Sequence, residues 1–378
     1  MAFVLGPRQV GKTTTCLALA DCYLDWDHVQ HQRLVLDGPD SVAQFAALDE
    51  LRSEPVTIAF DELHKFSRWK QFIKGLFDTY SDRSRSIVTG SSRLDVFRRG
   101  GDSLMGRYFI YRMHPFSLAE LISTEVSESL TRSPKPIGDE EWQALVQLGG
   151  YPEPLLRADQ RFSRRWNRLR HEQLFKEDVR DLTRVQELSQ LEALGTLLAS
   201  RSGEQLIMAN LAQEVRVAPN TLKAWIEILC SLHFGFLVRP WFRNVAKALR
   251  KEPKWFLRDW SGVVDPGKRA ETLVACHLLK AVEYWTDRGV GDFELRYLRD
   301  KLKREVDFIV IRDGEPWFLV EVKSADDRMS EHLAYFQDAT GARHAFQVAL
   351  ESPYVEADCF ARTDCVKVPA RTFLSQLV

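Results

Sequence analysis

Long hydrophobic runs are missing from this 378-residue sequence, and so is an excess of charge of either sign. No apolar stretch approaches the roughly 20 residues that a membrane-crossing helix needs. The first residues pass directly into an apolar strand pattern, without the basic and apolar regions of a signal peptide. With 52 Lys and Arg against 53 Asp and Glu, overall charge does not point to nucleic acid, and only a local patch could. We therefore expect a cytoplasmic protein that has no membrane partner.

Cysteine is sparse as well, which argues against a disulfide framework and against a zinc site. No C-x-x-C pair and no matching pair of histidines accompanies the six cysteines, which are scattered over positions 16, 22, 230, 276, 359 and 365. We expect free thiols in a reducing compartment. The composition, 45% hydrophobic and 28% charged, is that of a globular protein, and the length is enough for two or three domains.

The clearest motif is GPRQVGKTT, which begins at Gly6 and fits the phosphate-loop pattern G-x-x-x-x-G-K-[ST]. Glycines allow the backbone to approach an anion, and the N–H groups at the start of the next helix favour phosphate. Lys12 is expected to reach the β- and γ-phosphates, and the Thr13 hydroxyl to bind Mg²⁺. An ordinary glycine-containing turn is the alternative. The predicted ATP-binding residues are Gly6, Pro7, Arg8, Gln9, Val10, Gly11, Lys12, Thr13 and Thr14.

Two adjacent acids follow the apolar stretch Val56 to Phe60. A buried strand that ends in carboxylates one βαβ step after a phosphate loop is the expected second half of a nucleotide site. We predict that Asp61 holds Mg²⁺ and that Glu62 orients and deprotonates the attacking water. Solvated carboxylates at a strand end are the alternative. Between the two motifs we expect a helix over Thr13 to Tyr23 and then a short strand over Arg33 to Leu36.

Two further residues are candidates for the hydrolysis step. Ser91 follows an apolar strand over residues 86–89, where a hydroxyl could contact the γ-phosphate or the attacking water. Arg107 precedes another strand and is a candidate arginine finger. The alternatives are a plain turn at Ser91 and an ordinary surface arginine at Arg107. An arginine finger usually serves a neighbouring subunit, so a homo-oligomer is possible.

At this point the chain resembles the predicted AAA-superfamily ATPases of bacteria and archaea, in which this core precedes a C-terminal domain of unknown function, DUF4143. The resemblance is carried by GPRQVGKTT, IAFDELHK, VTGSS, SLMGR and HPFSLAEL. It implies an α/β fold with a parallel sheet, ATP and Mg²⁺ as ligands, and a helical lid to which GGYPEPL belongs. Arg157, beside that segment, could sense phosphate, or it could be a solvated arginine.

The middle of the chain shows a helix-turn-helix pattern. Helices are expected over 209–214 and 220–232, with Asn220 capping the second, and an apolar strand after them suggests a wing. Such a fold binds DNA in some proteins and packs against protein in others. In the DNA-binding interpretation the contacts come from Thr221, Lys223 and either Lys247 or Arg250.

The last third of the chain carries acidic residues inside apolar strand patterns. Glu271 lies near the start of a predicted helix, Asp307 lies in a strand, and EVK places Glu321 and Lys323 on one side of another strand. Charges in buried strands are costly unless they are paired or bind metal. Two carboxylates and a lysine suit a Mg²⁺ site for phosphodiester cleavage. The arrangement resembles the restriction-endonuclease-like PD-(D/E)XK superfamily, with Gln337 as a possible accessory residue; a structural ion pair or a degenerate nuclease fold are the alternatives.

Four segments follow from these patterns: an ATPase core over residues 1–116, a helical lid over 117–200, a winged helix-turn-helix over 201–250 and a nuclease-like α/β domain over 251–378. The leading hypothesis is an ATPase coupled to a DNA-handling C-terminal half with possible Mg²⁺-dependent nuclease activity. The second is an ATP-dependent switch whose C-terminal fold only binds nucleic acid or protein. The third is a toxin-like or defence nuclease with an ATPase sensor.

Overall fold

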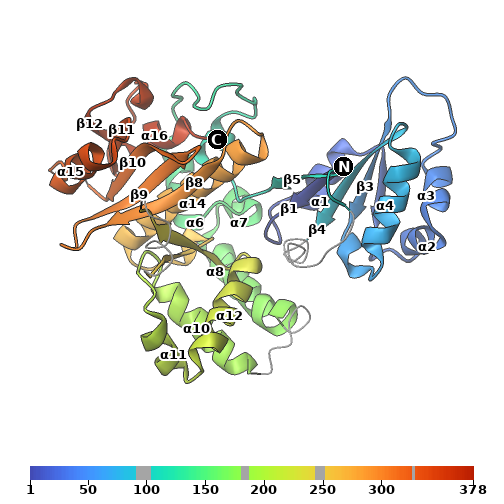
Figure 1. Ribbon diagram of the computed structural model, residues 1–378, viewed down its shortest axis with the longest axis horizontal. Helices are drawn as coiled ribbons and strands as arrows, with labels where there is room; N and C mark the ends of the chain where they lie inside the picture. Colours follow the sequence, from blue (N-terminus) through green and yellow to red (C-terminus); the bar gives the residue numbers. More distant parts are fainter. Residues whose placement is uncertain (91–103, 180–186, 243–251, 326–327) are drawn as a thin grey trace. The chain divides into compact units, whose positions relative to one another are not determined.

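The computed structural model describes residues 1–90, 104–179, 187–242, 252–325 and 328–378 (Figure 1). The chain forms two compact units, residues Met1–His114 and Pro115–Val378. Each unit has its own β-sheet.

The N-terminal unit is built on a five-stranded sheet whose described pairings are all parallel, in the order β2-β3-β4-β1-β5. This confirms the predicted α/β fold with a parallel sheet. The strands are β1 Ala2–Leu5, β2 Cys22–Asp25, β3 Val56–Asp61, β4 Ser84–Gly90 and β5 Phe109–Arg112. The helices are α1 Lys12–Leu19, α2 Val29–Asp37, α3 Pro39–Phe45 and α4 Trp69–Tyr80, with a 3-10 turn at Leu63–Lys65.

The second strand of this sheet lies where the sequence patterns did not place it. Arg33 to Leu36, expected as a strand, belongs to helix α2. The strand is β2, which begins only three residues after α1 ends at Leu19. Its Cys-Tyr-Leu run suits a pleated surface, and pairing with β3 supplies the backbone hydrogen bonds. Tertiary pairing therefore decides between helix and strand here.

The C-terminal unit contains a mixed seven-stranded sheet in the order β12-β11-β10-β9-β8-β6-β7. Its strands are β6 Gly235–Pro240, β7 Lys254–Leu257, β8 Phe293–Arg299, β9 Glu305–Arg312, β10 Glu315–Lys323, β11 His344–Ala349 and β12 Cys365–Pro369. The helices next to it include α14 Pro266–Asp287, α15 Glu331–Thr340 and α16 Ala370–Ser375.

The side chains of β9 and β10 point alternately to the two faces of the sheet, and both faces are covered by apolar clusters. Phe308 and Val320 belong to the hydrophobic cluster that includes α14, whereas Ile309 and Leu319 belong to a separate cluster with α15. Successive side chains of a strand point to opposite faces. The two clusters therefore lie on opposite sides of the sheet, with α14 in one of them and α15 in the other (Figure 1).

Helices fill the first half of this unit. They are α5 Leu118–Ile122, α6 Asp139–Leu148, α7 Pro152–Arg157, α8 Gln160–Gln173, α10 Leu188–Ser200, α11 Met208–Val215 and α12 Pro219–Ser231, with a π-helical turn at Leu174–Asp178. The expected cap of α12 is wrong: its N-cap is Ala218, and Pro219 takes the first helical position. A proline at that position fits because its missing N–H has no intrahelical partner there.

A buried histidine in α14 makes the stability of this unit depend on pH. His277 Nε2 accepts a hydrogen bond from the Leu118 N–H at 3.0 Å, and Nδ1 lies 2.8 Å from the Leu273 carbonyl oxygen. Burial lowers the pKa of His277 to about 4. Because the neutral ring is the folded form, its stabilisation is complete above the unfolded pKa of about 6.5 and is lost as pH falls toward 4. Between pH 7.5 and 5 we expect a loss of about 2 kcal/mol in the free energy of unfolding.

Urea unfolding of the wild type and of His277→Gln at the two pH values measures this loss. The variant lacks the titrating ring, so its stability should fall by about 2 kcal/mol less than that of the wild type. Equal losses in the two proteins would contradict the assignment to His277.

Candidate nucleotide site and C-terminal carboxylate cluster

The loop between β1 and α1 has the backbone of an anion-binding turn. Gly6 has φ 155°, Gln9 has φ 65° and Gly11 has φ 97°, and Gly11 is the N-cap of α1. A Cβ on Gly6 would lie 2.1 Å from the carbonyl oxygen of Met113. Glycine is therefore required at that position by contact with the neighbouring strand connection as well as by conformation.

Lys12 is held inside the loop. Its Nζ donates to the carbonyl oxygens of Gly6 at 2.9 Å and of Pro7 at 2.7 Å, and the residue is 8% exposed. Burial lowers the pKa of Lys12 to about 8, against the opposing attraction of Glu62 and Asp61. A cation with little water around it, beside the first N–H groups of a helix, is suited to phosphate oxygens.

Asp61 is the centre of a hydrogen-bond network at the carboxyl end of β3. Its Oδ2 accepts from Thr13 Oγ1 at 2.7 Å and from the Tyr23 hydroxyl at 2.7 Å, and its Oδ1 accepts from Thr89 Oγ1. Burial acts to raise the pKa of this carboxyl, but the hydroxyl donors together outweigh it and hold the pKa below its usual value. Asp61 is thus an ionised carboxylate beside the phosphate loop.

Tyr23 and Thr89 were missed from the sequence. Tyr23 was assigned to a helix, and the polar residue chosen after β4 was Ser91. Thr89 is the last residue but one of β4 and is fully buried. Its position in VTGSS, at the carboxyl end of a strand beside β1, was the signal that could have identified it. Ser91 lies outside the described residues, and its role stays a prediction.

Glu62 has a backbone that few residues adopt. Its φ of 53° is left-handed, and it starts the 3-10 turn that follows β3. Its carboxylate Oε2 lies 3.4 Å from Lys65 Nζ and 3.6 Å from His64 Nε2. A left-handed non-glycine residue costs on the order of 1 kcal/mol or more, and such strain is common at functional sites. This backbone turns the Glu62 side chain away from the strand direction immediately after Asp61.

Arg107 lies at the opposite end of the strands from the phosphate loop. It precedes β5, which runs parallel to β1, so it is at the amino end of the strands while the loop is at their carboxyl end. Its guanidinium Nε donates to Asp78 Oδ1 at 2.7 Å. Arg107 is therefore placed away from the phosphate loop of its own subunit, and its role as a finger for a neighbouring subunit stays a prediction.

The donor set around Asp61 fits Mg²⁺. The Thr13 hydroxyl and the Asp61 carboxylate, 2.7 Å apart, are hard oxygen ligands next to the loop. Mg²⁺ at nucleotide sites uses one or two such groups and completes its shell with phosphate oxygens and water. A cluster of three acids is therefore not needed, and none with the arrangement of a metal site occurs among the residues that the structure describes.

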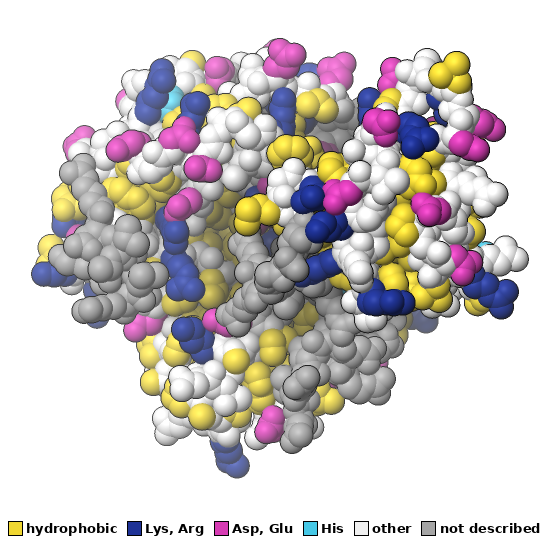
Figure 2. Space-filling view, turned by 45° about the vertical axis from the view of Figure 1, so that its right-hand side comes forward, with side chains coloured by type: hydrophobic (Ala, Val, Ile, Leu, Met, Phe, Trp, Pro, Cys, Tyr) yellow, Lys and Arg dark blue, Asp and Glu magenta, His cyan; other side chains and the backbone are white. Residues whose placement is uncertain are grey.

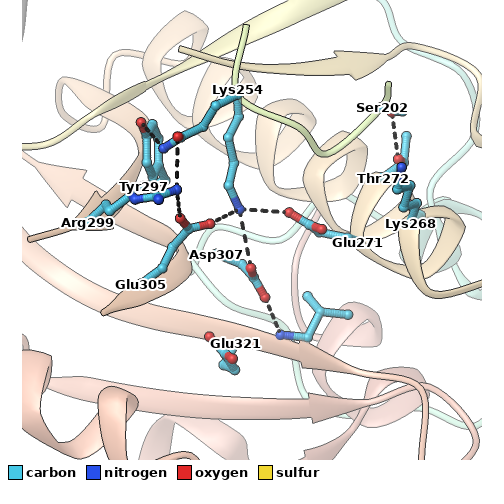
Figure 3. A network of polar contacts seen from close by, with 12 residues as sticks. Ser202, Lys254, Lys268, Glu271, Thr272, Tyr297, Arg299, Glu305, Asp307 and Glu321 are labelled. Carbon is cyan, nitrogen blue, oxygen red and sulfur yellow. Dashed lines mark hydrogen bonds and ion pairs between the residues drawn. The ribbon is translucent and has the colours of Figure 1, made fainter. Parts of the chain in front are cut away.

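The predicted nuclease-like residues do come together in the C-terminal unit, but around a lysine. Figure 3 shows Lys254, from β7, pointing between Glu271 of α14 and the β9 residues Glu305 and Asp307. Its Nζ lies 2.7 Å from Glu305 Oε1, 3.0 Å from Glu271 Oε1 and 3.4 Å from Asp307 Oδ1. Neither Lys254 nor Glu305 was predicted as part of this cluster.

Glu321 and Lys323 pair with each other rather than with Lys254. Lys323 Nζ lies 2.9 Å from Glu321 Oε1, whereas Glu321 Oε2 is buried and has no hydrogen-bond partner among the described residues. Burial, with the nearby negative charge of Asp307, raises the pKa of Glu321 to about 7. Asp307 Oδ2 accepts from the Val322 N–H at 2.9 Å, so the two predicted strands do align their acids. Gln337 instead donates to the carbonyl oxygens of Ala342 and Thr363.

This cluster does not fit Mg²⁺ as it stands. The oxygens of Glu271, Glu305 and Asp307 surround an ammonium at hydrogen-bond and ion-pair distances, not an open position. Mg²⁺ needs oxygen ligands at about 2.0–2.1 Å in octahedral geometry. The predicted metal-binding role of Glu271, Asp307 and Glu321 would require Lys254 to leave this position.

A basic helix surface was also missed from the sequence. In α8, Ser163, Trp166, Asn167 and Arg170 face inward or are partly buried, and the opposite side is exposed. Among the described residues no acidic side chain pairs with Arg161, Arg164 or Arg165, while Arg168 pairs with Glu172 at 3.1 Å. We call the four residues Arg161, Arg164, Arg165 and Arg168 the α8 arginine face. Their i, i+3, i+4, i+7 spacing was the available signal.

The residues predicted to contact DNA from the helix-turn-helix are only partly described by the structure. Lys223 is exposed on α12 and Thr221 is partly buried, whereas Lys247 and Arg250 lie outside the described residues. Arg157 pairs with Glu153 at 3.1 Å and lies over the ring of Phe162. Figure 2 shows basic and acidic side chains interspersed on the face in view. Within the described part of the chain no helix combines the length and apolar content needed to cross a bilayer.

Comparison with known proteins matches three segments of the chain to known domain families. Residues 139–264 match a domain of unknown function, DUF8612. An uncharacterised protein of Mycobacterium bovis and another of Mycobacterium tuberculosis are each 24% identical to the chain over 264 residues, 68% of this chain and 54% of each relative. The chain thus spans about half the length of these relatives. Residues 1–122 match the AAA domain, and residues 266–358 match a second domain of unknown function, DUF4143, as the sequence motifs had indicated. The chain therefore carries an N-terminal AAA domain and, later in the sequence, a DUF4143 domain.

Proposed function

We propose that this protein binds and hydrolyses ATP in its N-terminal unit and uses the nucleotide to control a C-terminal half that binds DNA. The observation that carries the ATPase part is the convergence of the buried Lys12 and the Thr13–Asp61 pair on one loop. The AAA domain supports an ATPase-like activity in general. Hydrolysis, the choice of ATP and the DNA partner are our proposals.

Each group of the nucleotide site has a separate task in this proposal. Loop N–H groups and the Lys12 ammonium bind the phosphates and offset the charge that develops on them. When bound, Mg²⁺ would be held by Thr13 and Asp61 and would supply further charge neutralisation. Thr89 and Tyr23 fix the Asp61 carboxylate, because each donates a hydroxyl hydrogen bond to it. Glu62, next in the chain, orients and deprotonates the attacking water.

Replacing Glu62 tests the hydrolysis step separately from binding. The Glu62→Gln variant keeps the shape of the side chain but cannot accept the proton of the attacking water. We expect the rate of phosphate release to fall about 10²- to 10³-fold while ATP affinity changes only a few-fold. Phosphate release and fluorescent-nucleotide titration measure the two quantities. The Glu54→Gln variant is the matched control, and equal rates for the two variants would assign the base to another residue.

The α8 arginine face supports DNA as the partner of the C-terminal half. Three of its arginines have no acidic partner among the described residues, although the whole chain has a net charge of −1. An unneutralised row of guanidinium groups along one helix matches the repeating charge of a phosphate backbone. The helix-turn-helix of α11 and α12 adds Lys223 and Thr221 as further candidates.

A switch that binds DNA without cutting it is favoured over a nuclease by one observation. Lys254 fills the position among the carboxylates that a nuclease of the PD-(D/E)XK type would need for metal. The test of the whole proposal measures ATP hydrolysis, DNA affinity with and without ATP, and cleavage of single-stranded and duplex DNA. We expect hydrolysis, nucleotide-dependent affinity and no cleavage; metal-dependent cleavage lost in Lys323→Ala would restore the nuclease hypothesis.

A further inference from the structure

Lys254 is a buried charge with a complete set of partners. Its side chain is 4% exposed, and its ammonium has three hydrogens to donate. Three carboxylates surround it, one from α14 and two from β9 (Figure 3). Burial disfavours the charged ammonium, but attraction to Glu271, Asp307 and Glu305 outweighs burial and raises the pKa of Lys254 well above its ordinary value. With carboxylate oxygens at 2.7, 3.0 and 3.4 Å, Lys254 is surrounded as an ammonium would be.

The distances distinguish an ammonium site from a metal site. The three oxygens lie 2.7, 3.0 and 3.4 Å from Nζ. For Mg²⁺ at the same point, each oxygen would have to move inward by roughly 0.7 to 1.3 Å, because its ligands lie at about 2.0–2.1 Å. The carboxylates are fixed by other contacts: Asp307 accepts from the Val322 N–H, and Glu305 from Arg299 at 3.0 Å. The set is arranged around the larger, hydrogen-bonding cation.

Charge leads to the same conclusion. Glu271, Glu305, Asp307 and Glu321 carry up to four negative charges, against the three cations Lys254, Arg299 and Lys323 that pair with them. A divalent ion added beside the ammonium would meet a like charge about 3 Å away in a poorly solvated place, where repulsion is strong. Without the ammonium, three buried carboxylates would repel one another and would attract a divalent cation.

We propose that Lys254 is the built-in cation of this carboxylate cluster. The C-terminal unit then keeps the acids of a nuclease-like fold but binds no divalent metal among them. Lys254 links β7, α14 and β9 and takes the position of the ion. The cluster braces the sheet and helix, and it leaves the C-terminal half as a binding module. This inference does not depend on DNA binding or on ATP hydrolysis.

Manganese binding to the full chain without nucleotide tests the proposal. Calorimetry and the paramagnetic resonance signal of free Mn²⁺ both measure this binding. In the wild type, Asp307→Asn should leave Mn²⁺ binding unchanged. Lys254→Met keeps the length of the side chain but removes its charge, and should gain one Mn²⁺ per chain, at least about tenfold tighter than any wild-type binding to these acids. The double variant Lys254→Met/Asp307→Asn should lose it again.

Lys268→Met is the matched control, because it removes an ammonium from α14, the helix that carries Glu271, and among the described residues the only acid that this ammonium pairs with is the exposed Glu204. It should gain no Mn²⁺. Wild-type Mn²⁺ binding that disappears in Asp307→Asn would overturn the proposal, and so would a Lys254→Met variant that folds and binds no additional ion. If Lys254→Met does not fold, the comparison of the wild type with Asp307→Asn still decides whether the native cluster holds a divalent cation.

Discussion

The Lys12→Ala variant should lose at least about a hundredfold in kcat/KM for ATP hydrolysis. The ammonium is buried, it is held by the carbonyl oxygens of Gly6 and Pro7, and it lies beside the start of α1. Alanine removes the cation that would stabilise the negative charge developing on the transferred phosphate. Because the phosphates are also bound in the ground state, ATP affinity should fall as well. Steady-state phosphate release and nucleotide titration measure both.

The Lys74→Ala variant is the control for charge and stability. Lys74 lies in α4 of the same unit, away from the loop, and the variant removes the same charge. Its hydrolysis rate should remain within about twofold of the wild type, since surface substitutions rarely exceed about 0.5 kcal/mol. A urea midpoint unchanged in Lys12→Ala would show that the unit still folds. An unaltered rate in Lys12→Ala would remove the phosphate loop from the chemistry and the ATPase proposal with it.

The nucleotide loop was predictable because its chemistry is local. Gly6, Gly11, Lys12 and Thr13 lie within one short stretch, so spacing alone identifies them. Tyr23 and Thr89 were not predictable in that way, because they approach Asp61 from two other strands. Their contribution depends on the strand order β2-β3-β4, and the first two residues of β2, Cys22 and Tyr23, had been assigned to the end of a helix.

The C-terminal cluster shows the same division. The apolar strands around Asp307 and Glu321 were predicted from their alternation, and the structure places them as the adjacent strands β9 and β10. Lys254 carries no such signal. It is one lysine in the sequence KEPKWFL, at the start of strand β7, which pairs with β6. Only the folded sheet brings it beside Glu271, and this one contact changes the expected chemistry of the acids.

The α8 arginine face leads to the second large effect. Changing Arg161, Arg164 and Arg165 together to Gln should weaken binding to duplex DNA about a hundredfold near 150 mM salt. Each arginine that contacts a phosphate releases about one counterion, so the slope of log K against log salt should become shallower by about three. Fluorescence anisotropy between 50 and 200 mM salt measures affinity and slope in one series. Sequence preference should change little, because phosphate contacts carry no base information.

A control variant separates the loss of phosphate contacts from the loss of net charge. Changing three exposed arginines of the C-terminal sheet region, Arg312, Arg343 and Arg362, to Gln removes the same net charge from the same unit. This control should keep most of the affinity and nearly all of the slope, since only contacts with phosphate release counterions. Equal losses in the two triple variants would mean that DNA responds to overall charge and not to α8. A wild type that binds no DNA at low salt would instead remove DNA as the partner, while the Lys12 and Glu62 variants would still test ATP hydrolysis.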